Sequence, residues 1–244
     1  MNKKVLLTGI SGYIGNHCAV ELLKNGYSVR GSVRSLSKSD KVIDAIKTEV
    51  DPKDNLEFCE LDLLSDDGWD DAMKGCEFVM HVASPFINIE PKDENEYIRP
   101  ALDGTMRTLN AAKRAGIKRV VLTSSMVSML GNADKSIKVD SETWTNVEAN
   151  NVSAYAKSKT LAEQAAWDFI NAQQGTPKME LAVVNPGPVF GPTLSGDLSG
   201  ASMGMFKQMM LGKMPMVPQA AINMSDVRDI AKIHVLALEN KKAN

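Results

Sequence analysis

The first fifteen residues constrain the fold of this chain more than any other segment. The apolar run Val5-Leu6-Leu7 leads into Thr8-Gly9-Ile10-Ser11-Gly12-Tyr13-Ile14-Gly15, and a helix-like stretch continues to Leu23. Backbone N–H groups at the start of a helix, with the positive end of its dipole, can hold a pyrophosphate without a charged side chain. This order of strand, turn and helix therefore predicts a dinucleotide site.

Each glycine of the turn has its own expected role. Gly9 permits a tight turn, Gly12 lets the backbone approach a pyrophosphate, and Gly15 lets the helix pack closely on the strand. The bare spacing also fits an ordinary glycine-rich loop between any strand and helix. Features later in the chain are needed to distinguish a dinucleotide site from an ordinary loop.

The composition of the chain limits the classes of partner that it can bind. The chain has 244 residues, enough for one large α/β domain, and its net charge of −2 indicates no nucleic-acid surface. No apolar run approaches the roughly 18 residues of a membrane helix, and the run after Lys4 ends too early for a signal peptide. We expect a cytoplasmic protein with a small-molecule partner, no nucleic acid and no membrane. We also expect no metal, because the cysteines and histidines form no ligand pattern: Cys18, Cys59, Cys76, His17, His81 and His234.

Strand-like and helix-like segments alternate along the first 185 residues, which is typical of parallel βαβ units. The expected strands are 4–8, 28–33, 56–60, 78–82, 119–123 and 181–185, and the expected helices are 13–25, 38–49, about 66–74, about 94–115 and 154–173. The fold class is therefore α/β, a doubly wound parallel sheet of Rossmann type in residues 1–187. The polar stretch 131–153, which contains Trp144, is expected to form a loop over a cleft.

The character of the chain changes after Asn185, where five prolines and glycines fall within seven residues. We expect residues 188–244 to form a small, partial substrate-binding lobe. Its last helix, at about 227–238, should pack back on the core with Ile230, Ile233 and Leu238 at helical spacing. The methionine-rich segment 203–216 either lines a substrate site or, more commonly for such segments, fills core space on a short helix.

The end of the second strand bears on the choice of dinucleotide. Folds that prefer NAD usually place a carboxylate there for the ribose 2′-hydroxyl. This chain has none in Val29–Ser35, and a guanidinium can pair with a 2′-phosphate. The position favours NADP, with Arg34 as the first candidate and Lys41 as the second. Both are also compatible with simple surface charges.

Tyr155 and Lys159 are four residues apart at the start of a predicted helix, so they share a face. A phenol with a pKa near 10 is a poor proton shuttle at neutral pH, and a nearby ammonium lowers that pKa. Ser125 follows the strand 119–123 at the sheet edge where ligands bind, and its hydroxyl can orient a carbonyl oxygen. A turn or helix-cap role is the alternative for this serine.

Together these features resemble the extended short-chain dehydrogenase/reductase superfamily, in the group of dihydroflavonol reductases, cinnamoyl-CoA reductases and yeast-type methylglyoxal or aldehyde reductases. The resemblance covers nearly the whole chain. It rests on Thr8–Gly15, Val29–Arg34, Asp62, His81–Pro85, Thr123–Ser125, Asp140–Trp144, Tyr155–Trp167 and Asn185–Pro192.

The resemblance implies an NADP(H)-dependent carbonyl reductase. Hydride passes to a carbonyl carbon, Tyr155 gives its proton to the oxygen, Ser125 orients that oxygen, and Lys159 lowers the pKa of Tyr155 and holds the ribose hydroxyls. Pro186 is implied near the nicotinamide. The residues expected at the cofactor are Gly9, Ser11, Gly12, Tyr13, Ile14, Gly15, Arg34, Lys41, Asp62, Leu63, Val82, Ala83, Ser84, Tyr155, Lys159, Pro186 and Val189.

The chain departs from the family pattern at three places. Ala101-Leu102-Asp103-Gly104-Thr105 stands where many members have Asn-Val-x-Gly-Thr, which argues against an asparagine-linked proton relay. Met126–Leu130 lacks the polar residue of plant flavonoid reductases, so an aliphatic or aromatic aldehyde or ketone is expected as the substrate. The chain ends at Asn244, before most members do, and we expect part of the substrate lobe to be absent.

Other functions within the fold are a sugar-nucleotide epimerase, a hydroxysteroid dehydrogenase, and a non-catalytic NADP-binding sensor. Arg34 argues against the tightly NAD-bound epimerases. The presence of Ser125, Tyr155 and Lys159 argues against the sensor. A homodimer is compatible with the resemblance, through the helices 94–115 and 154–173.

Overall fold

A six-stranded parallel sheet forms the centre of the molecule. The computed structural model describes residues 3–84, 91, 93–130, 139–198, 200–213 and 223–243. The strands are β1 (Lys4–Thr8), β2 (Ser28–Val33), β3 (Leu56–Glu60), β4 (Phe78–His81), β5 (Arg119–Thr123) and β6 (Glu180–Val184), in the order β3-β2-β1-β4-β5-β6. The chain runs outward from β1 to β3 and then crosses back to β4. This topological switch point between β1 and β4 is where such sheets bind ligands, and the expected fold class is confirmed.

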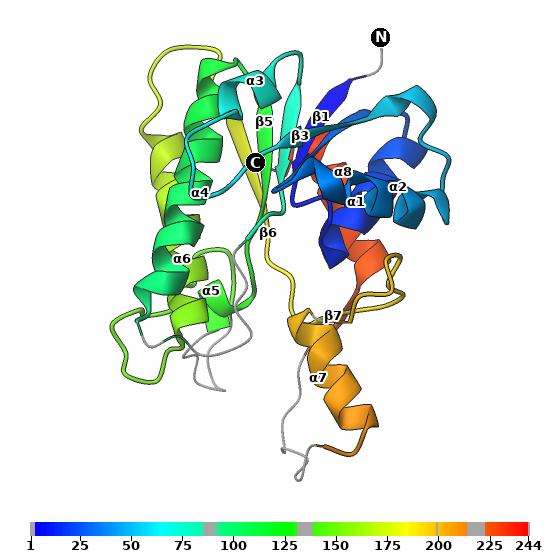
Figure 1. Ribbon diagram of the computed structural model, residues 1–244. Helices are drawn as coiled ribbons and strands as arrows, with labels where there is room; N and C mark the ends of the chain where they lie inside the picture. Colours follow the sequence, from blue (N-terminus) through cyan, green and yellow to red (C-terminus); the bar gives the residue numbers. More distant parts are fainter. Residues whose placement is uncertain are drawn as a thin grey trace.

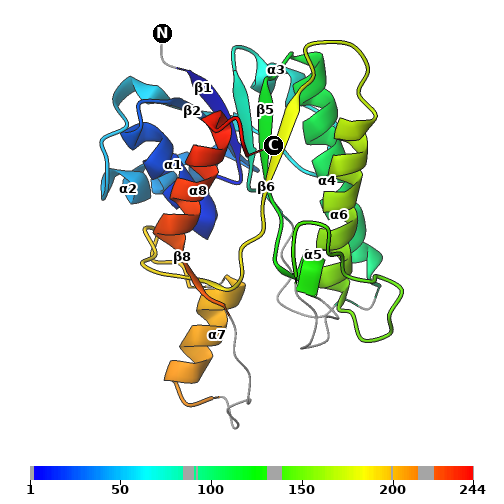
Figure 2. The ribbon, with the colours of Figure 1, turned by 180° about the vertical axis from the view of Figure 1, so that it is seen from behind.

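Helices cover both faces of the sheet (Figures 1 and 2). One face carries α1 (Tyr13–Lys24), α2 (Ser39–Lys47) and α8 (Val227–Glu239), and the other carries α3 (Trp69–Met73), α4 (Asn95–Arg114) and α6 (Ala154–Asn171). Along β1, Val5 and Leu7 join the core under α1, whereas Leu6 joins the core under α4 and α6. All three are fully buried. Burial on both sides explains why the strands are apolar runs without alternation.

The short elements are those that the sequence did not predict. They are η1 (Leu36–Lys38), η2 (Lys53–Asn55), α5 (Val127–Leu130), and a second sheet of two parallel strands, β7 (Val189–Phe190) and β8 (Ser225–Asp226). Of the expected loop 131–153, residues 131–138 lie outside the described residues. The part from 139 on consists of turns and irregular chain, as expected.

The C-terminal segment brings two corrections. α8 packs along α1, but Ile233 is 47% exposed, and the buried side of the helix carries Ile230, His234 and Leu238. The helix is rotated relative to our expectation because His234 occupies the inner position and pairs with Thr123. On α7 (Ala201–Met210), Met209 and Met210 are more than half exposed, so these two methionines are not core filler.

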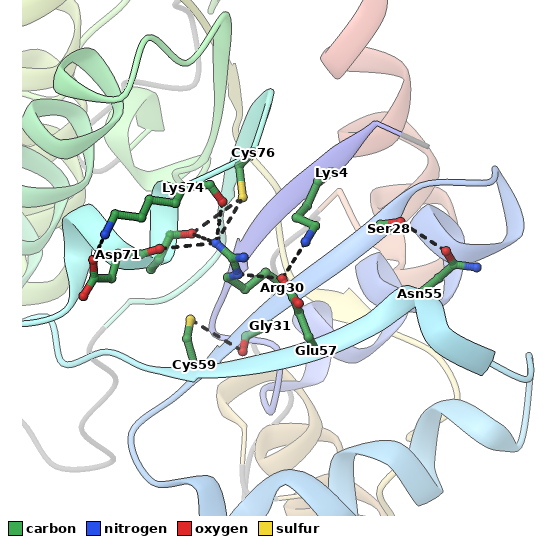
Figure 3. A network of polar contacts seen from close by, with 11 residues as sticks. Lys4, Ser28, Arg30, Gly31, Asn55, Glu57, Cys59, Asp71, Lys74 and Cys76 are labelled. Carbon is green, nitrogen blue, oxygen red and sulfur yellow. Dashed lines mark hydrogen bonds and ion pairs between the residues drawn. The ribbon is translucent and has the colours of Figure 1, made fainter. Parts of the chain in front are cut away.

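Arg30, in the middle of β2, ties the sheet to α3 (Figure 3). Its guanidinium donates to the carbonyl oxygens of Ala72 and Lys74 at 2.8 Å each, at the C-terminal end of α3, and to Glu57 on β3 at 2.7 Å. Carbonyls at a helix C-terminus lack partners within the helix. Arg30 therefore has a structural role, whereas Arg34 follows the carboxyl end of β2 and is exposed.

Candidate active site

The glycine turn has the shape that a pyrophosphate requires. Gly9 has a φ of +70°, and a Cβ there would lie 2.8 Å from the Cα of Ala83. A Cβ on Gly15 would overlap the carbonyl oxygen of Gly9. Gly12 caps the N-terminus of α1, and its own N–H donates to the Gly9 carbonyl at 3.0 Å. Gly9 and Gly15 thus pack the turn tightly, whereas a Cβ on Gly12 would meet only the Gly9 carbonyl oxygen, at 3.3 Å, at the positive end of a helix.

The segment after β4 is fixed beside this turn. The Thr8 hydroxyl lies 2.8 Å from Nδ1 of His81 and accepts the N–H of Ala83 at 3.1 Å. Burial lowers the pKa of His81 to about 3, so its ring is neutral at pH 7. These contacts hold Ala83 against Gly9, and Val82 and Ser84 flank Ala83 in the chain.

Arg34 and Lys41 are both exposed beyond the carboxyl end of β2. No hydrogen bond or ion pair of Arg34 occurs with any residue that the structure describes. Asp62 follows β3, and its carboxylate accepts the N–H of Leu64 at 2.9 Å, which shapes the turn that carries Leu63. Leu63 packs onto α4 at Gly104, where a Cβ would come within 2.8 Å of its side chain. This contact gives a packing reason for the glycine in the Ala101–Thr105 segment.

The phosphate turn also contacts the second sheet. Tyr13 and Ile14 pack against Val189, Val227 and Ile230 in a small apolar cluster, while Ser11 is exposed at the tip of the turn. The Tyr13 hydroxyl is buried without a hydrogen-bond partner in the described chain, and burial raises the pKa of Tyr13 to about 12. Val189 thus contacts the phosphate turn through the side chains of Tyr13 and Ile14.

Ser125, Tyr155 and Lys159 meet at the carboxyl end of β5. A hydrogen bond with Ser125 lowers the pKa of Tyr155, but burial has the larger effect and raises it. The expectation that Lys159 sets a low pKa for this phenol is therefore not what the geometry indicates. The ring of Tyr97, on α4, meets the ring of Tyr155 edge to face, with centroids 6.2 Å apart.

Lys159 is buried under the same strand. Its Nζ donates to the carbonyl oxygen of Thr123 at 3.3 Å. Burial lowers its pKa to about 8, against the opposing effect of the nearby Glu163 carboxylate. Lys159, Glu163 and Ser124 line one cavity. The Ser124 hydroxyl is buried and has no hydrogen-bond partner among the described residues.

Pro186 is held beside this group from the end of β6. Its carbonyl oxygen accepts the N–H of Met126 at 2.9 Å, directly after Ser125. Three residues behind Ser125 were not predicted from the sequence to belong to the site: Ser128, Glu163 and Asn185. Glu163 could have been found, because it lies four residues after Lys159 and so shares its helix face.

The described residues contain no group of three or more histidine, cysteine, aspartate or glutamate side chains able to hold a metal ion. Within the same residues, no helix is long and apolar enough to cross a membrane.

Comparisons with known proteins give matches along the whole chain. The model of the "NAD dependent epimerase/dehydratase family" matches residues 5–244. Cinnamoyl-CoA reductase CAD2 of Medicago truncatula is 35% identical over 98% of this chain and 73% of its own length. The NADPH-dependent methylglyoxal reductase GRE2 of Saccharomyces cerevisiae is 32% identical over 98% of this chain and 75% of its own.

Solved structures agree with these matches. Gre2 of Candida albicans in complex with NADPH superposes with a TM-score of 0.81 at 30% identity, over 99% of this chain and 76% of that one. A UDP-glucose-4-epimerase from Stenotrophomonas maltophila, with bound NAD, has a TM-score of 0.79 over 98% of this chain and 74% of that one. At 23% identity, the likeness to the epimerase concerns the fold alone.

Proposed function

Since this chain belongs to the NAD-dependent epimerase/dehydratase family, we propose that it is an NADPH-dependent reductase of a small aldehyde or ketone. The observation that carries the proposal is the hydrogen bond between Ser125 and Tyr155, beside the buried Lys159, at the carboxyl end of β5. The expected resemblance is confirmed, and with it the class of an NADP(H)-using oxidoreductase.

The residues present fit the dinucleotide. The turn Gly9–Gly15 would hold the pyrophosphate, because a Cβ on Gly12 would project into space that the chain leaves open at the N-terminus of α1. Arg34 and Lys41 would hold the 2′-phosphate, and Asp62 and Leu63 would face the adenine. Ala83 and Ser84 would line the path to Pro186 and Val189. When bound there, NADPH supplies the hydride that adds to the carbonyl carbon.

The protein's own residues handle the proton. Burial raises the pKa of Tyr155, so the phenol is protonated at neutral pH and can act as an acid. Its proton goes to the carbonyl oxygen, which Ser125 orients through a hydrogen bond. The Lys159 ammonium stabilises the tyrosinate that is left, until solvent returns a proton.

We assign residues 1–187 to the cofactor and residues 188–244 to the substrate side. The segment after Ser125 is Met126-Val127-Ser128-Met129-Leu130, and the Ser128 hydroxyl is buried in contact with Glu163. The apolar side chains of this segment suit an aliphatic or aromatic carbonyl compound better than a polyhydroxylated one.

The test is NADPH consumption with a panel of aldehydes and diketones, together with Tyr155→Phe. We expect the variant to lose at least about 100-fold in kcat and to bind NADPH as before. Tyr27→Phe is the matched control, because it removes a buried phenol next to Glu239, and it should keep full activity. Binding of NADPH without turnover of any carbonyl compound would instead favour the non-catalytic sensor.

A further inference from the structure

Glu163 is a buried carboxylate for which the proposed reaction has no use. It lies on α6 one turn after Lys159, and 6% of its surface is exposed. A carboxylate at such a depth is costly unless its charge is paired and its oxygens are hydrogen-bonded. Glu163 meets the second condition with two hydrogen bonds, and the buried Lys159 lines the same cavity.

Glu163 connects three segments of the chain behind Ser125. Its Oε2 accepts from Oγ of Ser128, on α5, and from Nδ2 of Asn185, which follows β6, at 2.8 Å each. The Asn185 amide also lies 3.4 Å from the carbonyl oxygen of Ser125, and the Ser128 N–H donates to that same oxygen at 3.0 Å. The carboxylate thus fixes the main chain of Ser125 from behind.

Glu163 also acts on the charge of Lys159, with which it lines one cavity. Its carboxylate opposes the effect of burial on the Lys159 pKa. The other titratable groups around this lysine are His81 on β4, Tyr155 on α6 and Tyr97 on α4, next to Tyr155. His81 is neutral because burial lowers its pKa to about 3, and burial keeps Tyr155 protonated. Among these groups, Glu163 is the acidic side chain.

We propose that Glu163 is a positioning residue with two tasks: it keeps Lys159 in its ammonium form, and it holds Ser125 in place for Tyr155 through Ser128 and Asn185. The consequence for turnover rests on the proposed function. The coupling between Glu163 and Lys159 does not, so the two can be tested separately.

The first experiment measures kcat against pH. Glu163→Gln keeps the shape and an acceptor oxygen but removes the charge. The alkaline limb of the profile should move to lower pH by about one unit or more. Ser128→Ala leaves the charge in place, so it should lower kcat without moving that limb. Glu94→Gln, which breaks an exposed ion pair with Lys157, is the control. If the alkaline limb of the kcat profile lies at the same pH in Glu163→Gln and in the wild type, the proposal is overturned.

The second experiment needs no turnover. Melting temperatures are compared for Glu163→Gln, Lys159→Met and the double variant, without cofactor. We expect Glu163→Gln to lower Tm by several degrees when Lys159 is present, and by much less in the Lys159→Met background. Strictly additive changes in Tm would overturn the pairing. If the single variant Glu163→Gln does not fold, the double variant with Lys159→Met must be more stable than that single variant, or the pairing is refuted.

The two experiments also separate this inference from the proposed function. Coupled melting temperatures without reduction of any carbonyl compound would refute the reductase and leave the pairing intact. Reduction of a carbonyl compound with additive melting temperatures would refute the pairing alone.

Discussion

Single residues at the glycine turn separate folding from binding. A Cβ on Gly15 overlaps the Gly9 carbonyl oxygen, whereas a Cβ on Gly12 lies 3.3 Å from the same atom and otherwise faces open space. We therefore expect Gly15→Ala to be strongly destabilised. Gly12→Ala should fold with a Tm within a few degrees of wild type but lose most of its NADPH affinity. Thermal melting measures the loss of stability, and fluorescence titration with NADPH measures the loss of affinity. Equal melting temperatures for Gly15→Ala and Gly12→Ala would contradict the separate roles of the two glycines.

Arg34 is the residue that should distinguish the two nicotinamide dinucleotides. Loss of a charge-assisted pair with a 2′-phosphate costs about 1.5–3 kcal/mol. We expect Arg34→Ala to weaken NADPH binding by about 10- to 100-fold and to leave NADH binding nearly unchanged, as measured by titration calorimetry. Lys47→Ala, which removes a cation from the far end of α2, is the control. Equal losses for NADPH and NADH would argue against contact with the 2′-phosphate.

At the scale of single residues, the sequence showed which side chains carry the chemistry but not their environment. Tyr155 and Lys159 could be found from their spacing, and Ser125 from its place after a strand. The raised pKa of Tyr155 could not be predicted, because it depends on burial under α4 and on the ring of Tyr97. Glu163 was missed because its partners, Ser128 and Asn185, are far from it in sequence.

At the scale of elements, Arg30 shows how β2 and α3 stabilise each other. Its side chain is 17% exposed, and its guanidinium meets the last carbonyls of α3 and Glu57. Arg30→Met leaves those carbonyls without a partner, so we expect a loss of about 2 kcal/mol in unfolding free energy. That loss corresponds to a fall of about 4–8 °C in Tm.

Arg114→Met is the matched control for this variant. Arg114, on α4, pairs with Asp70, on α3, but its side chain is 59% exposed. Its removal should change the unfolding free energy by less than about 0.5 kcal/mol. Losses of similar size in the two variants would mean that the cap on α3 contributes little.

The long elements were predictable, and the short ones were not. β1, β2, β3 and β5 begin and end where the apolar runs and turn residues placed them. β7 and β8 have two residues each, too few for any periodicity to show, and they pair across more than thirty residues of chain. The rotation of α8 escaped prediction because a histidine, His234, occupies a core position and hydrogen-bonds Thr123.

At the scale of the whole molecule, buried histidines should make stability depend on pH. The folded pKa of His81, about 3, lies below the unfolded value of 6.5. Between these values the unfolded chain binds a proton that the folded chain does not, so stability is lost as pH falls through 6.5 toward 3. His234, whose pKa burial also lowers, acts in the same direction.

We expect His81 alone to remove about 2 kcal/mol of unfolding free energy between pH 7 and pH 5. Urea unfolding at several pH values measures this slope. His81→Gln should be less stable at pH 7 but show a flatter dependence on pH. A slope that is unchanged in the variant would mean that His81 is not the group that titrates.

The packing of α8 on α1 has a consequence for synthesis on the ribosome. The two helices lie side by side, but about 200 residues separate them in the chain. At roughly 5–20 residues per second, translation of that interval takes about 10–40 s. Throughout it, the apolar side of α1 that α8 later covers remains open to solvent or to a chaperone. α1 is thus enclosed only long after it is made, and the nascent chain exposes this apolar surface until α8 emerges.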